Sequence, residues 1–168
     1  HNNLYRCIVS ACGYIDTSDV AQINILPLPV IYTQPVDIFE CPGLSTVFSI
    51  DASNVASYQW YLNNGIQWYA LSDTGVYSGS NSAYLSIADV SGKDNYEYCC
   101  VVSGCGAVYS SDTVKLFLYD LPKITANPVD VLDCSNAVTN FSISATDATS
   151  YEWFENQSGS SWVKLNDG

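Results

Sequence analysis

A repeat with a period of 93 residues constrains this chain more than any other feature of its sequence. When the sequence is shifted by 93 positions, 25 of the first 67 residues are identical to their partners without a gap. The phrase "YRCIVSACG" at residues 5–13 returns as "YCCVVSGCG" at residues 98–106. After residue 67 the register slips by one, because the second copy has an extra residue in "NQSGSS", as is usual for loops. The period predicts a small domain as the folding unit.

The period divides the chain into one complete repeat and parts of two others. The phrases "LPLP" (26–29) and "YDLP" (119–122) are the natural boundaries. We therefore expect the last strands of one domain in residues 1–26, a complete domain in 27–120, and the first half of a further domain in 121–168. We interpret the chain as a window on a longer tandem array. Its short, proline-containing linkers should allow limited movement between domains.

Alternation of apolar and polar residues predicts an all-β fold. In residues 46–52 and 57–62 every second side chain is apolar, which is the period of a strand with one buried face. Asn64-Gly65 is a signal for a type I′ hairpin turn, in which both central residues have positive φ. Further strands are expected at 83–90, 96–104 and 112–120, and no segment has a sustained helical period. Seven or eight short strands in 93 residues predict an antiparallel β-sandwich.

Composition bears on the partners and on the location of the chain. Seventeen acidic residues against five basic ones give a formal net charge of −12, which disfavours nucleic acid and anionic membrane surfaces. No run of roughly 20 apolar residues is present, so we expect no membrane insertion in this segment. Seven cysteines in 168 residues favour an oxidising location outside the cytoplasm.

Several residues resemble the immunoglobulin pattern Asp-x-Gly-x-Tyr-x-Cys. In "DNYEYCC" (94–100) Asp94, Tyr98 and Cys100 are in place, and Tyr96 stands where glycine is usual. Trp60 lies where the core tryptophan of strand C would be. The resemblance implies tandem immunoglobulin-like β-sandwiches in which the Tyr98 hydroxyl bonds to the backbone near the turn between strands E and F, a tyrosine corner. The equivalent positions of the partial copies are Tyr5 for Tyr98 and Trp153 for Trp60.

The first cysteine of the repeat departs from the immunoglobulin pattern and resembles a bacterial one. Cys41 lies in "ECPGLS", before strand B, and is followed by "YQW" (58–60) and "YCCVVSGCG" (98–106). This arrangement resembles Ig-like repeats of large Bacteroidetes surface proteins, including gliding-motility adhesins exported by the type 9 system. The resemblance implies an extracellular, cell-surface location. It also implies O-glycosylation at Thr113, since Asp112-Thr113-Val114 is similar to the acceptor motif of that group.

The cysteines are interpreted as structural rather than as metal ligands. A C-x4-C spacing on an extended strand separates the two sulfurs by roughly 15 Å, which is too far for one ion or one disulfide. Within one sandwich the turn before strand B and the start of strand F lie at the same end, so a disulfide between Cys41 and Cys100 is the favoured pairing. Cys105 then either stays free or bonds across a domain junction to the turn cysteine of a neighbouring repeat, with Cys99 as a further candidate. The equivalent cysteines of the partial copies are Cys7, Cys12 and Cys134.

The sequence offers no recognisable catalytic constellation, so we expect no enzyme activity. The single histidine is His1, and a Ser-His or Cys-His pair is therefore missing from the complete repeat. We interpret the scattered acids Asp51, Asp73, Asp89 and Asp94 as solvated loop residues or turn caps. Calcium at a domain junction is the alternative, and no other cofactor is expected.

One tryptophan follows the predicted hairpin turn in each of the two copies. Trp68 and its equivalent Trp162 are expected to pack beneath the hairpin, because both copies keep them while the loop beside them changes length. Stacking on a sugar ring is the alternative interpretation.

The function predicted from the sequence is a stiff structural or adhesive stalk within a bacterial surface adhesin or filament. The expected partners are neighbouring repeats, surface glycans or other cells, and other copies through lateral association of edge strands. A carbohydrate-binding or spacer module of a secreted enzyme is the alternative. A eukaryotic Ig-type receptor is disfavoured by the position of Cys41.

Overall fold

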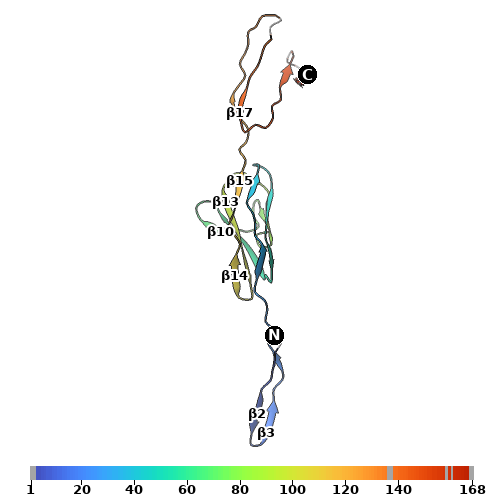
Figure 1. Cartoon of the computed structure of the whole chain (residues 1–168), viewed down its shortest axis with the longest axis vertical. Helices are drawn as coiled ribbons and strands as arrows, with labels where there is room; N and C mark the ends of the chain where they lie inside the picture. Colours follow the sequence, from blue (N-terminus) through green and yellow to red (C-terminus); the bar gives the residue numbers. More distant parts are fainter. Residues whose placement is uncertain (1–2, 136–137, 158, 160, 167–168) are drawn as a thin grey trace. The chain divides into compact units, whose positions relative to one another are not determined.

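The alternating segments of residues 27–120 fold into two facing layers of β-strands (Figure 1). The computed structural model describes residues 3–135, 138–157, 159 and 161–166, and its regular structure in these ranges consists of β-strands. The chain forms two compact units, the first ending at Phe117 and the second beginning at Leu118. The fold is all-β, as the sequence predicted, and its strand pairs are antiparallel apart from β6 with β15, which is described below.

One sheet of the complete repeat contains its longest strand at the centre. The order is β10-β9-β13-β15-β6, and β14 also pairs with β13. Neighbours pair antiparallel along β10, β9, β13 and β15. The strands are β6 (Ile38–Glu40), β9 (Ser57–Asn63), β10 (Trp68–Ala70), β13 (Tyr96–Gly104), β14 (Ala107–Ser110) and β15 (Val114–Leu118).

The opposite layer is made by two sets of paired strands. β7 pairs with β12, which pairs with β11, while β5 pairs with β8. The strands are β5 (Val30–Thr33), β7 (Thr46–Ser49), β8 (Asp51–Ser53), β11 (Tyr77–Ser78) and β12 (Tyr84–Ile87). The strand predicted at 46–52 is therefore interrupted at Ile50, whose N–H donates to the Ala83 carbonyl at 3.0 Å. This break lets one segment pair with two different neighbours.

The core lies between the two sheets and contains the side chains that the alternation placed on one face. Phe48 is 1% exposed, and Trp60, Leu85 and Tyr98 are fully buried. The Phe48 ring lies 4.8 Å from that of Tyr98 and 6.3 Å from that of Trp60. The indole N–H of Trp60 donates to the Ser82 carbonyl at 2.9 Å, so the buried ring keeps its hydrogen bond.

The hairpin at Asn64-Gly65 forms, but the expected type I′ turn does not. Trp68 is directly opposite Asn63, so the loop contains four residues rather than two. Only Gly65 among them has a positive φ, at 88°. The Asn63 side chain accepts the Gly65 N–H at 3.0 Å, and the Asn64 side chain accepts the Ile66 N–H at 3.3 Å. These side-chain bonds replace the backbone bonds of a tighter turn.

The segment before the complete repeat forms a two-part hairpin. Its outer part is β1 (Leu4–Tyr5) with β4 (Ala21–Gln22), and its tip is β2 (Ile8–Ala11) with β3 (Tyr14–Thr17). Every residue of these strands is exposed.

The unit that begins at Leu118 contains two short antiparallel pairs. β16 (Lys123–Ala126) pairs with β17 (Ser144–Thr146), and β18 (Phe154–Asn156) pairs with β19 (Trp162–Lys164). Within the residues that the structure describes, no helix is long and apolar enough to cross a lipid bilayer.

Candidate functional site

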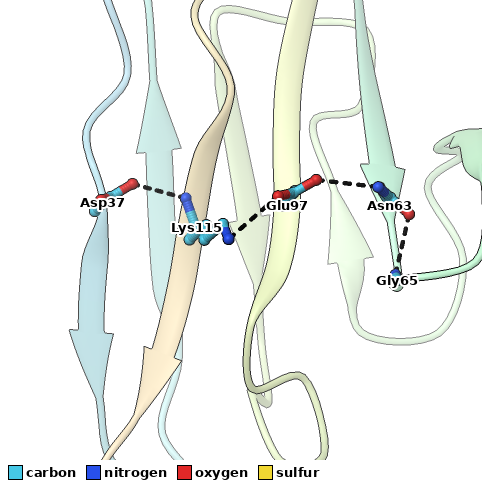
Figure 2. Close-up of polar contacts among 5 residues, drawn as sticks. All are labelled: Asp37, Asn63, Gly65, Glu97 and Lys115. Atoms are coloured by element: carbon cyan, nitrogen blue, oxygen red, sulfur yellow. Dashed lines mark hydrogen bonds and ion pairs between the residues drawn. The ribbon is translucent and has the colours of Figure 1, made fainter.

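A row of polar contacts crosses the large sheet of the complete repeat (Figure 2). The Lys115 backbone N–H donates to Asp37 Oδ1 at 2.8 Å, and Lys115 Nζ lies 3.3 Å from Glu97 Oε1. Asn63 Nδ2 donates to the other carboxylate oxygen of Glu97 at 3.0 Å, and Gly65 N–H donates to Asn63. The row thus joins the segment before β6 to β15, β13 and β9.

The row is half-exposed, so it contributes little to the free energy of folding and mainly aligns the strands that it joins. The side chains of Lys115 and Glu97 are 44% and 29% exposed. An ion pair of this exposure contributes about 0–1 kcal/mol, because water screens it. Its effect is to hold neighbouring strands in one register.

The first and last strands of this sheet run parallel to each other. Asp112 N–H donates to Gln34 Oε1 at 2.9 Å, and Lys115 N–H donates to Asp37 Oδ1. The Phe39 and Phe117 rings stack at 4.7 Å with an interplanar angle of 18°. In each of these three contacts the two residues are 78 positions apart in the sequence. Because this separation stays constant along the strands, β6 and β15 run in the same direction.

The chain enters and leaves the complete repeat at opposite ends. The Cys105 thiol, in the β13–β14 turn, donates to the Leu26 carbonyl at 3.4 Å, and Asn54 Nδ2 donates to the Leu28 carbonyl at 3.2 Å. The incoming segment therefore lies beside the β13–β14 turn. The last strand, β15, runs antiparallel to β13 and ends beside the other end of β13, where Tyr96 pairs with Leu116.

The expected Cys41–Cys100 disulfide is not formed, and the strand register is incompatible with it. All seven cysteines are described, and each is a free thiol in this structure. Both cysteines can be placed relative to the segment that contains β15. The 78-residue offset puts Cys41 level with Tyr119, and the β13–β15 register puts Cys100 level with Asp112, which is seven residues earlier. Seven positions correspond to about 23 Å along a strand, and a disulfide needs Cα atoms roughly 4.4–6.8 Å apart. The structure therefore does not support this pairing, which assumed that Cys100 lies at the start of its strand, whereas it lies in the middle of β13.

The two cysteines of β13 lie on opposite faces of the sheet. Cys100 is fully buried opposite Trp60, and burial raises the pKa of its thiol to about 12. Cys99 faces outward opposite Tyr61 and is half-buried, which also raises its pKa. Cys100 therefore acts as a small apolar core residue. The remaining cysteines are exposed: Cys7, Cys12, Cys41, Cys105 and Cys134.

The tyrosine expected at the corner between strands E and F is buried, with a different partner for its hydroxyl. The Tyr98 hydroxyl lies 3.4 Å from that of Tyr77, in β11, rather than bonding to the backbone of the turn. Burial raises the pKa of both phenols. The equivalent residues of the partial copies are not buried: Tyr5 is 50% exposed and Trp153 is 38% exposed.

Trp68 lies on the outer face of the sheet and not beneath the hairpin. Its register partner Asn63 points away from the core, so Trp68 does too, and it is 44% exposed. With Tyr61 and Cys99 it lines a shallow pocket of about 350 Å³, which also borders on Thr113. Trp162, the equivalent residue, is 71% exposed. The packing role predicted for Trp68 was wrong, because the four-residue loop after Asn63 places it opposite Asn63 on the outer face.

Two of the loop acids act as turn caps, as expected. Asp73 accepts the Ser80 N–H at 2.7 Å, and hydrogen bonds from Ser80 lower its pKa. Asp89 accepts the Ser91 N–H at 2.8 Å, and this bond likewise lowers its pKa. No cluster of three or more potential metal ligands occurs in the described part of the chain. His1 lies outside the described residues, and calcium at a junction stays a prediction.

Comparison with known proteins identifies the fold. No protein-family model matches the chain, and no curated protein matches it. Among solved structures, it resembles the I-band fragment I67–I69 of titin with a TM-score of 0.51 and 18% identity, over 62% of this chain and 37% of that one. It also resembles extracellular domains 3–5 of Drosophila OTK with a TM-score of 0.53 and 16% identity, over 71% and 41% of the two chains. The fold is immunoglobulin-like.

The chain spans less than half the length of either structure, so the likeness is one of fold alone. The sequence identified the sandwich but missed the parallel contacts between its first and last strands. Residues such as Gln34 and Asp112 are far apart in sequence and carry no local pattern.

Proposed function

We propose that this chain is a load-bearing repeat segment of a large bacterial cell-surface adhesin or extracellular filament, with no catalysis in the segment. The parallel pairing of β6 with β15 carries the proposal. Its immediate partners are the neighbouring repeats of the same array, and its location is outside the cell.

The geometry of the complete repeat is suited to tension. The chain enters at the end near Cys105 and leaves beyond β15 at the other end. A pull on both sides therefore drives β6 and β15 past each other in shear. Shear loads all the contacts between the two strands together, including the bonds at Gln34 and Asp37 and the stacked rings of Phe39 and Phe117. Peeling would break such contacts one at a time.

The finer assignment, to gliding-motility or other type 9 secreted adhesins, is supported by the sequence phrases around Cys41 and Cys105. The motif at Asp112-Thr113-Val114 adds to it, since Thr113 is exposed and accessible for O-glycosylation while Val114 is buried. Lateral association is a further proposal. Among the described strands, the exposed edge strand β10 pairs only with β9, so its other side is available to another chain.

Localisation on the source cells tests the proposal. Antibodies raised against residues 27–120 would be used for immunogold electron microscopy of intact cells. We expect label along extended structures that project from the cell surface. Label confined to the cytoplasm, or to a compact secreted enzyme in the culture medium, would contradict the proposal.

The pocket beside Trp68 favours a second candidate function, carbohydrate binding as a module of a secreted enzyme. Tyr61 and Trp68 present aromatic side chains at a shallow pocket, which is an arrangement suited to stacking on a sugar ring. A glycan array would compare the protein with Trp68→Ala and with Tyr84→Ala, which removes an exposed ring elsewhere. Binding that is lost only with Trp68→Ala supports this function. If the unmodified protein binds none of the glycans on the array, this function is excluded for the set tested.

A further inference from the structure

Two cysteine positions recur at the 93-residue period and lie outside the core. Cys105 and its equivalent Cys12 are named the tip cysteines, because each lies in a turn between two paired strands. Cys41 and its equivalent Cys134 are named the turn cysteines, because Cys41 directly follows β6. All four side chains are exposed. Their places in the complete repeat indicate which of them can meet.

The conformation of the tip does not require a cysteine. Gly104 pairs with Ala107, so the turn between them has two residues. These are Cys105 and Gly106, with φ angles of 47° and 77°. A turn with two positive φ angles favours Asn-Gly, since most residues with a Cβ atom are strained there. Cys12 occupies the same place in the hairpin of β2 and β3 with a φ of 50°. A cysteine therefore recurs where the backbone disfavours it, which indicates that the thiol itself is needed.

The tip and turn cysteines of one repeat lie at opposite ends of its sandwich. Cys41 is level with Tyr119, which follows β15. The register of β15 with β13 ends at the pair of Leu116 with Tyr96, so Cys41 lies beyond the start of β13. Cys105 directly follows the other end of β13. The nine residues of β13 extend over about 30 Å, whereas a disulfide needs Cα atoms roughly 4.4–6.8 Å apart. The partner of Cys105 is therefore not Cys41 of its own repeat.

The tip cysteine lies against the linker through which the chain enters the complete repeat. The Cys105 thiol donates to the Leu26 carbonyl at 3.4 Å. The neighbouring Gly104 packs so closely on the linker that an added Cβ atom would lie 3.0 Å from Pro29 Cγ. These contacts fix Leu26 beside Cys105. A group of the preceding repeat that lies level with Leu26 should therefore lie near Cys105 as well.

The period predicts which group of the preceding repeat lies level with Leu26. Leu26 is the equivalent of Tyr119, and Cys41 is level with Tyr119. We therefore expect the turn cysteine of the preceding repeat to be level with Leu26. Since β6 and β15 are neighbours in the sheet, the separation should be about one strand spacing, roughly 4.8 Å. The turn cysteine and Cys105 thus approach the same linker residue, one from each side of the junction.

We propose that Cys105 forms a disulfide with the turn cysteine of the preceding repeat, across the junction at Leu26. This inference rests on the proposed function, because the bond needs a tandem array and an oxidising location. The partner lies on the N-terminal side, because the tip is at the end where the chain enters. Cys100 stays in the core, and Cys99 stays a thiol on the outer face of β13.

Formation of the bond is a two-electron oxidation, and the oxidant is the disulfide of a thiol–disulfide oxidoreductase. The Cys105 thiolate attacks one sulfur of that disulfide, which gives a mixed disulfide and releases the other sulfur as a thiolate. The thiolate of the turn cysteine then attacks the Cys105 sulfur, and the second sulfur of the oxidoreductase leaves. The two protons lost from the cysteines convert the oxidoreductase to a dithiol. Cys105 and Cys41 are exposed to such an enzyme, whereas Cys100 is fully buried.

The bond protects the complete repeat under tension. It joins the preceding repeat directly to Cys105, so force bypasses the chain between the two sulfurs. The bypassed part includes β5 to β13 of the complete repeat. Only the residues after Cys105 can then extend, and the repeat cannot release its full contour length. The disulfide thus adds to the resistance that β6 and β15 give in shear.

A disulfide map of the full-length protein tests the bond. The protein would be taken from the source cells, treated with iodoacetamide to block free thiols, digested without reduction and analysed by mass spectrometry. We expect the peptide that contains Cys105 to be linked to the peptide that contains the turn cysteine of the preceding repeat. Cys99 should be in no linked peptide. An unlinked Cys105, or a link from Cys105 to Cys41 or to a following repeat, would overturn the inference.

Two substitutions in the full-length protein form a matched pair. Cys105→Ser should leave the turn cysteine of the preceding repeat without its partner, so that iodoacetamide modifies it without prior reduction. Cys99→Ser should leave the same turn cysteine protected. An equal degree of modification in the two variants would contradict the bond.

Stretching of the full-length protein before and after reduction gives a mechanical measurement. Reduction should increase the number of unfolding events of about 300 Å per molecule, the length of one repeat at roughly 3.5 Å per residue. Equal numbers before and after reduction would count against the bond. An unlinked Cys105 in protein that immunogold labelling places on surface structures overturns the bond alone. Label confined to the cytoplasm contradicts the proposed function, and the bond with it.

Discussion

Ser111 gives the sharpest test of the packing of the complete repeat. It is 8% exposed, and its hydroxyl accepts the Cys100 N–H at 2.9 Å and donates to the Asp112 carbonyl at 2.8 Å. Ser111→Ala would leave the N–H of a fully buried residue without its partner. An unsatisfied buried donor costs about 1–3 kcal/mol, so we expect a loss of about 2 kcal/mol in the free energy of unfolding. For a domain of this size, that loss lowers Tm by about 10 °C.

Urea unfolding followed by tryptophan fluorescence measures this loss. Trp60 is the buried tryptophan, while Trp68, Trp153 and Trp162 are 38–71% exposed and contribute less to the change on unfolding. The urea midpoint should fall at an unchanged m-value.

The chain contains its own control for this substitution. Ser18 makes the same bonds as Ser111, with lengths of 2.9 Å, but in an exposed hairpin. Water replaces the lost bond there, so Ser18→Ala should leave the main transition within about 0.5 kcal/mol. An unchanged midpoint for Ser111→Ala, or equal shifts for the two variants, would refute the reasoning.

Two further predictions concern the core. Phe48→Ala should destabilise the complete repeat by about 3–5 kcal/mol because it opens a cavity beside Tyr98, whereas the exposed equivalent Phe141 should tolerate alanine with little change in the same urea transition; similar losses for both would contradict the assigned burial. Alkylation at pH 8 should modify exposed Cys12 rapidly and spare Cys100 until the domain unfolds, since burial raises the pKa of Cys100 to about 12. Because the folded thiol keeps its proton while the unfolded thiol ionises near its ordinary pKa of 9.0, stability should fall as the pH rises above that value. Cys100→Ala should make this fall less steep, and the raised pKa values of Cys99, Tyr77 and Tyr98 should maintain the rest of it.

Much of the fold could be predicted because burial leaves a local trace in the sequence. The alternation around Phe48 and Trp60 identified both buried faces, and the Asp-x-x-x-Tyr-x-Cys phrase located the central strand. The hairpin β1–β4 and the unit that begins at Leu118 repeat internal strand registers of the complete repeat, as copies related by the 93-residue period would.

The other features depended on how distant segments align in three dimensions, and no local sequence pattern indicates such an alignment. The sequence does not show that, in the folded sheet, Cys41 and Cys100 are separated by about seven residues along the strand direction. The face occupied by Trp68 follows from a loop of four residues, which the Asn64-Gly65 signal did not specify. The parallel contacts of β6 with β15 join residues 78 positions apart and emerge only when the sandwich closes.

Single-molecule stretching of the 168-residue chain tests the load-bearing role most directly. Unfolding of the complete repeat, from Val30 to Leu118, should release a contour length of about 300 Å, at roughly 3.5 Å per residue, in one event. Asp37→Ala removes a contact between the sheared strands and should lower the force of that event, whereas Asp130→Ala, at the equivalent position of the unit that begins at Leu118, should not. An event of that length with its force unchanged by Asp37→Ala would contradict the proposed shear mechanism.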